Sequence, residues 1–130
     1  MNSIKAEIIA LKTAGSLTLV ELVTADIRLK SIVIDTPETV NYLVEGSKVN
    51  VVFKETEVSV ATERLMSISL QNQISGVIES LTKGELLSRV ELITELGIIS
   101  AVITTDSVQR LNLKVGQKAY ALIKTNELML

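Results

Sequence analysis

Hydrogen-bond donors gather in the second half of the chain, at the ends of the elements that the sequence predicts there. They are small hydroxyl and amide side chains together with one lysine. Such donors, with backbone N–H groups at the start of a helix, suit a tetrahedral oxyanion because they replace its hydration shell without a metal ion. The ordinary alternative is that the hydroxyls only cap a helix and the lysine is only solvated. The residues concerned are Ser69, Gln71, Asn72, Thr104, Ser107, Lys124 and Thr125.

The composition excludes most other kinds of site. There is no Cys and no His, which removes disulfides, thiol and imidazole chemistry and the usual ligands of zinc, copper and iron. No pair of carboxylates has a reason to share a pocket, so we predict no bound metal cation and no enzymatic activity. A net charge of -2, with two Tyr and one Phe, argues against nucleic-acid binding, which needs a basic groove and stacking rings.

The N-terminal segment carries charges where a signal peptide needs an apolar core, and no apolar run reaches the length of a membrane span. We therefore expect a cytoplasmic protein that does not contact membranes.

The sequence contains an internal repeat. Leu17 matches Leu87, Gly46 matches Gly116 and Lys54 matches Lys124, each pair 70 residues apart and without a gap. Two copies of one module, about residues 1–61 and 72–130 joined by residues 62–71, is the simplest interpretation. As domains we divide the chain into residues 1–65 and 66–130.

Each copy is predicted to be all-β. After a first strand, β-branched and aliphatic runs predict further strands at residues 16–24, 29–34, 48–54 and 57–60, and at residues 85–94, 98–103, 118–124 and 127–130. We expect the last strand of each set to close its own copy. Five short antiparallel strands per copy favour two tandem barrels of the oligonucleotide/oligosaccharide-binding (OB) type.

Each copy should also contain one short helix between its third and fourth strands. In the first copy, residues 35–43 predict a helix capped by Thr36, with Pro37 at the first helical position. In the second copy, residues 104–113 predict a helix capped by Thr104 or Thr105.

Several strands are apolar on both faces. Val20 and Leu22 should face the core, whereas Leu17, Leu19 and Val23 lie on the opposite face. Because units of about 65 residues with so few aromatic rings are marginal alone, we expect the outer apolar face to be covered by further copies in a homo-oligomer.

Three segments of the second copy resemble the signature blocks of the molybdenum-pterin-binding (Mop, or TOBE) domain family, the molbindins. The family's domains often open with Ser-Ala-Arg-Asn-Gln followed by Gly-x-Val, continue through Ile-Thr-x-Asp-Ser-Val at a helix start, and end with Ile-Lys-Thr or a close variant. The first copy resembles the last two blocks and preserves little of the first. The matching residues are Ser69, Asn72, Gln73, Gly76 and Val77; Ile103, Thr104, Asp106, Ser107 and Val108; and Ile123, Lys124 and Thr125.

The resemblance implies a small five-stranded barrel, molybdate or tungstate as ligand at contacts between domains, and a trimer of two-domain chains. It implies anion contacts from Ser69, Thr104, Ser107, Lys124 and Thr125, with backbone N–H groups beside them. One departure is that the family's Ala-Arg is Leu70-Gln71 here, so a neutral amide replaces a guanidinium.

In the first copy the candidate contacts are Thr36 and Lys54. A constant offset places Ile34 opposite Thr104, whereas a local slip of two residues places Thr36 there. Glu55 matches Thr125, and its carboxylate would repel an anion if it pointed at one. We therefore favour the second copy as the binding copy.

The leading functional hypothesis is reversible binding of molybdate or tungstate for storage or homeostasis. The alternative is an oxyanion-sensing effector module of a transcriptional regulator or transporter ATPase, of which this chain would be a fragment. The methionine start favours the first hypothesis.

Overall fold

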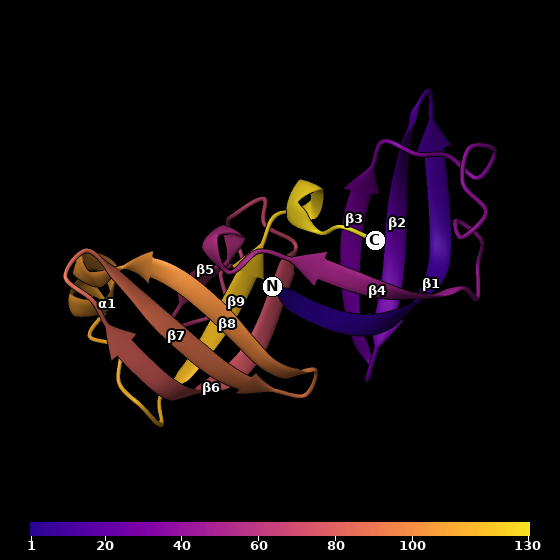
Figure 1. The fold of residues 1–130 in the computed structure, drawn as a ribbon. Helices are drawn as coiled ribbons and strands as arrows, with labels where there is room; N and C mark the ends of the chain where they lie inside the picture. Colours follow the sequence, from indigo (N-terminus) through magenta and orange to yellow (C-terminus); the bar gives the residue numbers. More distant parts are fainter.

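In the computed structural model, which describes residues 1–130, the first copy forms a four-stranded antiparallel sheet, sheet A (Figure 1). Its strand order is β3-β2-β1-β4. Alternation places Val20 and Leu22 in the core and leaves Leu17 exposed on the other face, as the sequence predicts. The strands are β1 (Asn2–Ala14), β2 (Leu17–Thr24), β3 (Ile27–Val33) and β4 (Lys48–Phe53).

The second copy forms a five-stranded antiparallel sheet, sheet B, with the order β5-β9-β6-β7-β8. Its four long strands repeat the pairing of sheet A, and β1 and β6 each carry a register shift at the matching place, between Ile8 and Ala10 and between Ile78 and Ser80. The strands are β5 (Ser59–Ala61), β6 (Asn72–Lys83), β7 (Leu87–Thr94), β8 (Gly97–Thr104) and β9 (Lys118–Ile123).

The last segments of the two copies are exchanged, which corrects the expectation that each closes its own copy. Ser59 of β5 pairs with Leu122 of β9, and Met129 pairs in the same way with Val52 of β4. Two short 3-10 helices, η1 (Glu55–Glu57) and η2 (Thr125–Glu127), carry the chain across. Each copy therefore completes the sheet of the other.

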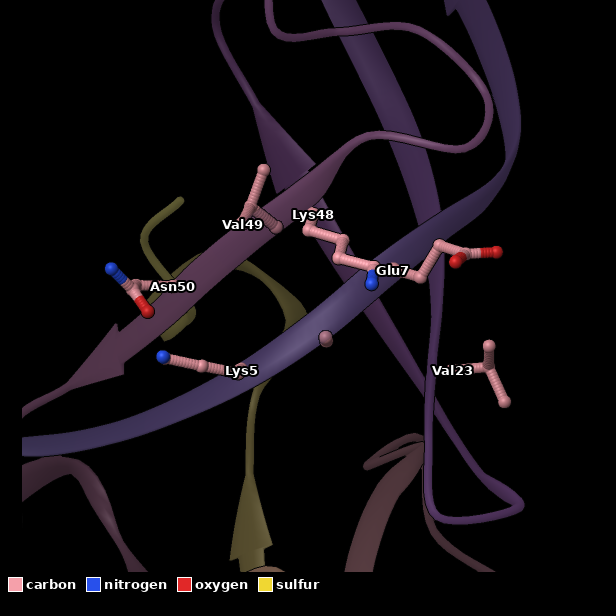
Figure 2. A pocket seen from close by; sticks show the side chains of 7 residues that line it. Lys5, Glu7, Val23, Lys48, Val49 and Asn50 are labelled. Atoms are coloured by element: carbon pink, nitrogen blue, oxygen red, sulfur yellow. The ribbon is translucent and has the colours of Figure 1, made fainter.

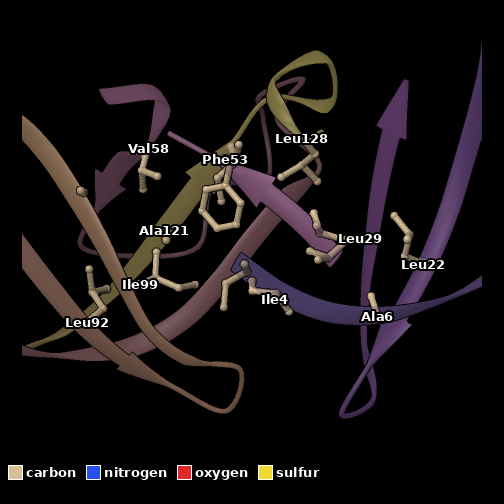
Figure 3. Close-up of a cluster of buried hydrophobic side chains, with 14 of the residues drawn as sticks. Ile4, Ala6, Leu22, Leu29, Phe53, Val58, Leu92, Ile99, Ala121 and Leu128 are labelled. Carbon is tan, nitrogen blue, oxygen red and sulfur yellow. The ribbon is translucent and has the colours of Figure 1, made fainter. Parts of the chain in front are cut away.

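The core is continuous through both copies. Figure 3 shows Ile4 and Phe53 of the first copy close to Ile99 and Ala121 of the second. All of these side chains belong to one buried cluster of 22 apolar residues. Phe53, the single phenylalanine and the largest fully buried side chain, thus lies where the two copies meet.

Only the second copy has the predicted helix, α1 (Thr105–Arg110), with Thr104 at its N-cap. The helix expected at residues 35–43 is a pair of turns. The N–H groups of Thr39 and Val40 both donate to the carbonyl of Thr36, at 3.0 and 3.1 Å, and the helical pattern then stops. The Thr39 hydroxyl also bonds the Thr36 backbone, and such local bonds compete with a helix in a segment containing β-branched residues. None of the helices has the length and apolar character required to span a bilayer.

Candidate functional site

Asn72 lies at the boundary between the two copies, and its amide is fully used there. Its Nδ2 donates to the carbonyls of Lys30 at 2.8 Å and Ile123 at 3.0 Å, while its Oδ1 accepts from the N–H of Lys30. A neutral amide has two N–H donors, so none is left for an anion. The structure therefore gives this predicted anion contact a structural role.

Asn2, which is not among the residues predicted from the sequence, makes the matching contact in the opposite direction. Its Nδ2 donates to the carbonyl of Ser100 at 2.9 Å, and its Oδ1 accepts from the Ser100 N–H at 2.8 Å. Asn2 and Asn72 are 70 residues apart, as are Lys30 and Ser100. The repeat offset shows that two asparagines stand at matching places, but only the structure shows that both are buried and join the copies.

Thr104 and Ser107 lie together where α1 begins. The Thr104 hydroxyl donates to Ser107 Oγ at 2.8 Å and accepts from the Ser107 N–H at 3.0 Å. The Ser107 hydroxyl hydrogen has no partner within the chain and can donate outward. Thr105, the other predicted cap, is buried and bonds Ser88 and the carbonyl of Gly84.

Ser69 and Lys124 lie together in another place, a hollow of about 380 Å³ where the linker meets the end of β9. Glu57 and Glu127 line the same hollow, and no carboxylate lies within ion-pair distance of the Lys124 ammonium. Thr125 follows at the start of η2. Figure 1 shows α1 at the end of sheet B away from sheet A, whereas β9 runs toward the boundary between the copies. Within one chain, the two parts of the predicted donor set are separate.

Gln71 lines a different hollow, of about 600 Å³, with Arg28, Arg64 and Lys118. Arg64 and Lys118 both lie over the ring of Tyr120, at 5.4 and 5.6 Å from its centroid. The side chain of Gln73 bonds the backbone of Leu65 and Leu70 and so holds the linker in place. Asp26 and Glu95 also line the hollow around Gln71, and Ser69 lines a different one.

A third hollow, of about 530 Å³, lies on sheet A between β1 and β4 (Figure 2). Lys5, Lys48 and Glu7 surround it, and it contains none of the predicted contacts. It is the repeat counterpart of the hollow around Gln71, since Lys48 matches Lys118 and Val23 matches Ile93.

The first copy offers a different set of groups. Thr36 lies in the turn after β3, where its N–H donates to Thr39 Oγ1 at 2.8 Å. Lys54 is exposed just before η1. The carboxylate of Glu55 points at cations: its Oε1 is 3.1 Å from the Met1 amino group and 3.3 Å from Arg89 Nη2. The hydrogen bond from the Met1 amino group is the main cause that lowers the pKa of Glu55. Desolvation opposes it, and the charge of the amino group and the contact with Arg89 lower the pKa further.

The exchange of end segments decides which groups face each other. η1 of the first copy packs against β8, which ends at Thr104, and η2 of the second copy packs against β3, which leads to Thr36. Each lysine therefore lies at the start of a 3-10 helix that packs against a strand of the other copy. No cluster of three or more carboxylates, histidines or cysteines that could hold a metal ion is present.

Two curated relatives are similar to this chain over half its length. Molybdenum-pterin-binding protein 1 of Clostridium pasteurianum is 38% identical over 66 residues, which are 50% of this chain and 97% of that protein. A probable molybdenum-pterin-binding protein of Haemophilus influenzae is 35% identical over 65 residues, which are 49% of this chain and 94% of that one. The chain belongs to the molbindin family of Mop/TOBE proteins.

The TOBE domain model matches residues 68–130 of this molbindin. A solved structure covers both copies: the cytoplasmic molybdate-binding protein ModG, in a form with molybdate bound, superposes with a TM-score of 0.91 at 25% identity. The match spans 98% of this chain and 93% of ModG. The molbindin therefore carries the domain in tandem, with the same arrangement of its two copies.

Proposed function

We propose that this molbindin binds molybdate reversibly, and tungstate in the same place, for storage or homeostasis of the metal in the cytoplasm. The observation that carries the proposal is the likeness of both copies together to molybdate-bound ModG. The similar proteins are named as binding proteins, which supports a function without catalysis and does not favour the alternative of a regulator's or transporter's effector module.

The anion contacts that we propose are Ser69, Lys124 and Thr125 of one chain, completed by Thr104 and Ser107 of a neighbouring chain. The hollow that holds Ser69 and Lys124 is also lined by Glu57 and Glu127, so one ammonium faces two carboxylates there. Such a place attracts a dianion weakly by itself. The hydroxyl pair at the start of α1 has an outward donor but no cation among its hydrogen-bond partners, so the two parts complement each other.

A homo-oligomer brings these parts together, and a trimer of two-copy chains is the assembly that we propose. Its support is an apolar row across the outer face of sheet B. Val77, Ile93 and Ile98 are direct neighbours on β6, β7 and β8, and they are 45%, 49% and 56% exposed. Covering a row of this kind on each chain favours association. We keep residues 1–65 and 66–130 as the proposed repeat units.

Isothermal titration calorimetry of the purified protein with molybdate, tungstate and sulfate tests the proposed function. We expect binding of the first two and little heat with sulfate. Absence of binding with all three would reject oxyanion storage. Light scattering of the same sample tests the assembly, since a monomer at micromolar concentration would contradict a site shared between chains.

A further inference from the structure

A side-chain carboxylate of the chain itself lies between cations at one boundary between the copies. The Glu55 carboxylate of the first copy reaches Arg89 of β7, at 3.3 Å, and the Met1 amino group, at 3.1 Å, through the same oxygen. Arg89 Nη2 also donates to the hydroxyl of Ser100 on β8, at 3.3 Å. Two cations thus converge on one carboxylate oxygen, and one of them also contacts the Ser100 hydroxyl.

The repeat shows what is unusual about this carboxylate. Glu55 and Thr125 occupy matching places, and each follows a lysine, Lys54 or Lys124. At the Lys124 boundary the matching residue is a hydroxyl, which can donate to an anion. At the Lys54 boundary it is a carboxylate, which can only accept.

A tethered carboxylate competes with any free anion for the same donors. Glu55 is held next to Arg89 by the chain, so its effective concentration exceeds that of a ligand in solution. Its charge also repels a second anion at contact distance. Glu91 adds to this repulsion, because its carboxylate accepts from the Ser100 hydroxyl at 3.4 Å. While Glu55 occupies these donors, the affinity of the place for an external oxyanion is low.

We propose that Glu55 is a built-in ligand that fills a second oxyanion site, formed by Arg89 and the Met1 amino group, so that only the Lys124 boundary takes up an external oxyanion. This inference rests on the proposed function for the identity of the ligand, a tetrahedral dianion such as molybdate. It predicts that the two boundaries of one chain differ. The Lys124 boundary is open to an external oxyanion, and the Lys54 boundary is occupied by the carboxylate of Glu55.

The test is titration of the full chain with molybdate after Glu55→Thr, which installs the residue found at position 125. We expect a second class of site, and hence more molybdate bound per chain than in the unmodified protein. The double variant Glu55→Thr/Arg89→Ala should lose that second class. Glu38→Thr, which removes an equally negative exposed side chain of the first copy, should leave the number of ions per chain unchanged.

Glu55→Gln keeps the size of the side chain and serves if Glu55→Thr does not fold, as judged by circular dichroism. An unchanged number of molybdate ions in a folded Glu55 variant would overturn the inference, although binding by the unmodified protein would still support the proposed function. Binding by the Glu55 variant alone would support the second site and reject the proposed function. No binding by either protein would reject both.

Discussion

Asn72 and Lys30 exchange two hydrogen bonds of 2.8 Å across the boundary between the two repeat copies. Asn2 and Ser100 repeat this exchange in the opposite direction. Together with the crossing of β5 and of the segment ending at Met129, these contacts make each copy a part of the other's sheet. The two copies therefore share one core and meet at two related boundaries.

Replacing Asn72 tests how much this contact stabilises the protein. Asn72→Ala leaves buried backbone groups of Lys30 and Ile123 without partners, so we expect the free energy of unfolding to fall by about 2–4 kcal/mol. Urea denaturation measures the change. Asn50→Ala, on an exposed position of β4, should change it by less than about 0.5 kcal/mol. Equal effects of the two variants would contradict a special role for Asn72.

Separating the copies tests the exchange of end segments. A fragment of residues 66–130 lacks β5 and Phe53, and its own last segment has no β4 to join. We expect two such fragments to exchange their ends and form a dimer, because exposed strand edges and apolar surface favour pairing. Size-exclusion chromatography with light scattering measures the mass, and a folded monomeric fragment would show that the exchange is dispensable.

Removing the Lys124 ammonium tests the open boundary. Lys124→Ala takes away a cation that no carboxylate of the chain pairs with, so we expect molybdate to bind about tenfold or more weakly, as for loss of one charge-assisted hydrogen bond. Calorimetry gives the dissociation constant. Lys114→Ala, at an exposed loop position, is the matched control. Unchanged affinity in Lys124→Ala would place the site elsewhere.

Acid should weaken the Glu55 contacts. The pKa of Glu55 lies below its ordinary value of 4.5, chiefly because the Met1 amino group donates to it. Its contribution to stability is therefore complete above pH 4.5 and is lost as the pH falls through the lower pKa of the folded state. Urea denaturation from about pH 6 to about pH 3 should show a shallower loss of stability in Glu55→Gln than in the unmodified protein. Parallel curves would mean that the Glu55 contacts do not stabilise the fold.

Much of the architecture could be predicted from local pattern. Alternation along Leu17–Thr24 predicts which side chains enter the core, because the two faces of a strand alternate with a period of two. Gly46 and Gly116 precede the fourth strand of each copy at φ +88° and +90°, a conformation that favours glycine. The helix at residues 35–43 was wrongly predicted, because hydroxyl bonds within its first turn satisfied the backbone locally.

The sequence does not predict which of the candidate contacts lie close together in space. Ser69 and Lys124 come together, Thr104 and Ser107 come together, and Gln71 lines a third place with charged residues of both signs. Matching motif blocks predict which residue types are present, but the distance between two blocks depends on which sheet each strand joins. Asn72 was likewise predicted as an anion contact, and only its position against Lys30 shows that its amide hydrogens are already used.

The sequence by itself determined the duplication, most of the strands and the family, since all three depend on residue types at fixed spacings along the chain. The strand predicted at residues 127–130 is only a bridge at Met129. Tertiary structure alone decided that the copies exchange their ends, that Asn2 and Asn72 join them, and that Glu55 meets Arg89. These contacts link residues as far apart as Asn2 and Ser100, and whether they form depends on how the core packs, which local pattern does not encode.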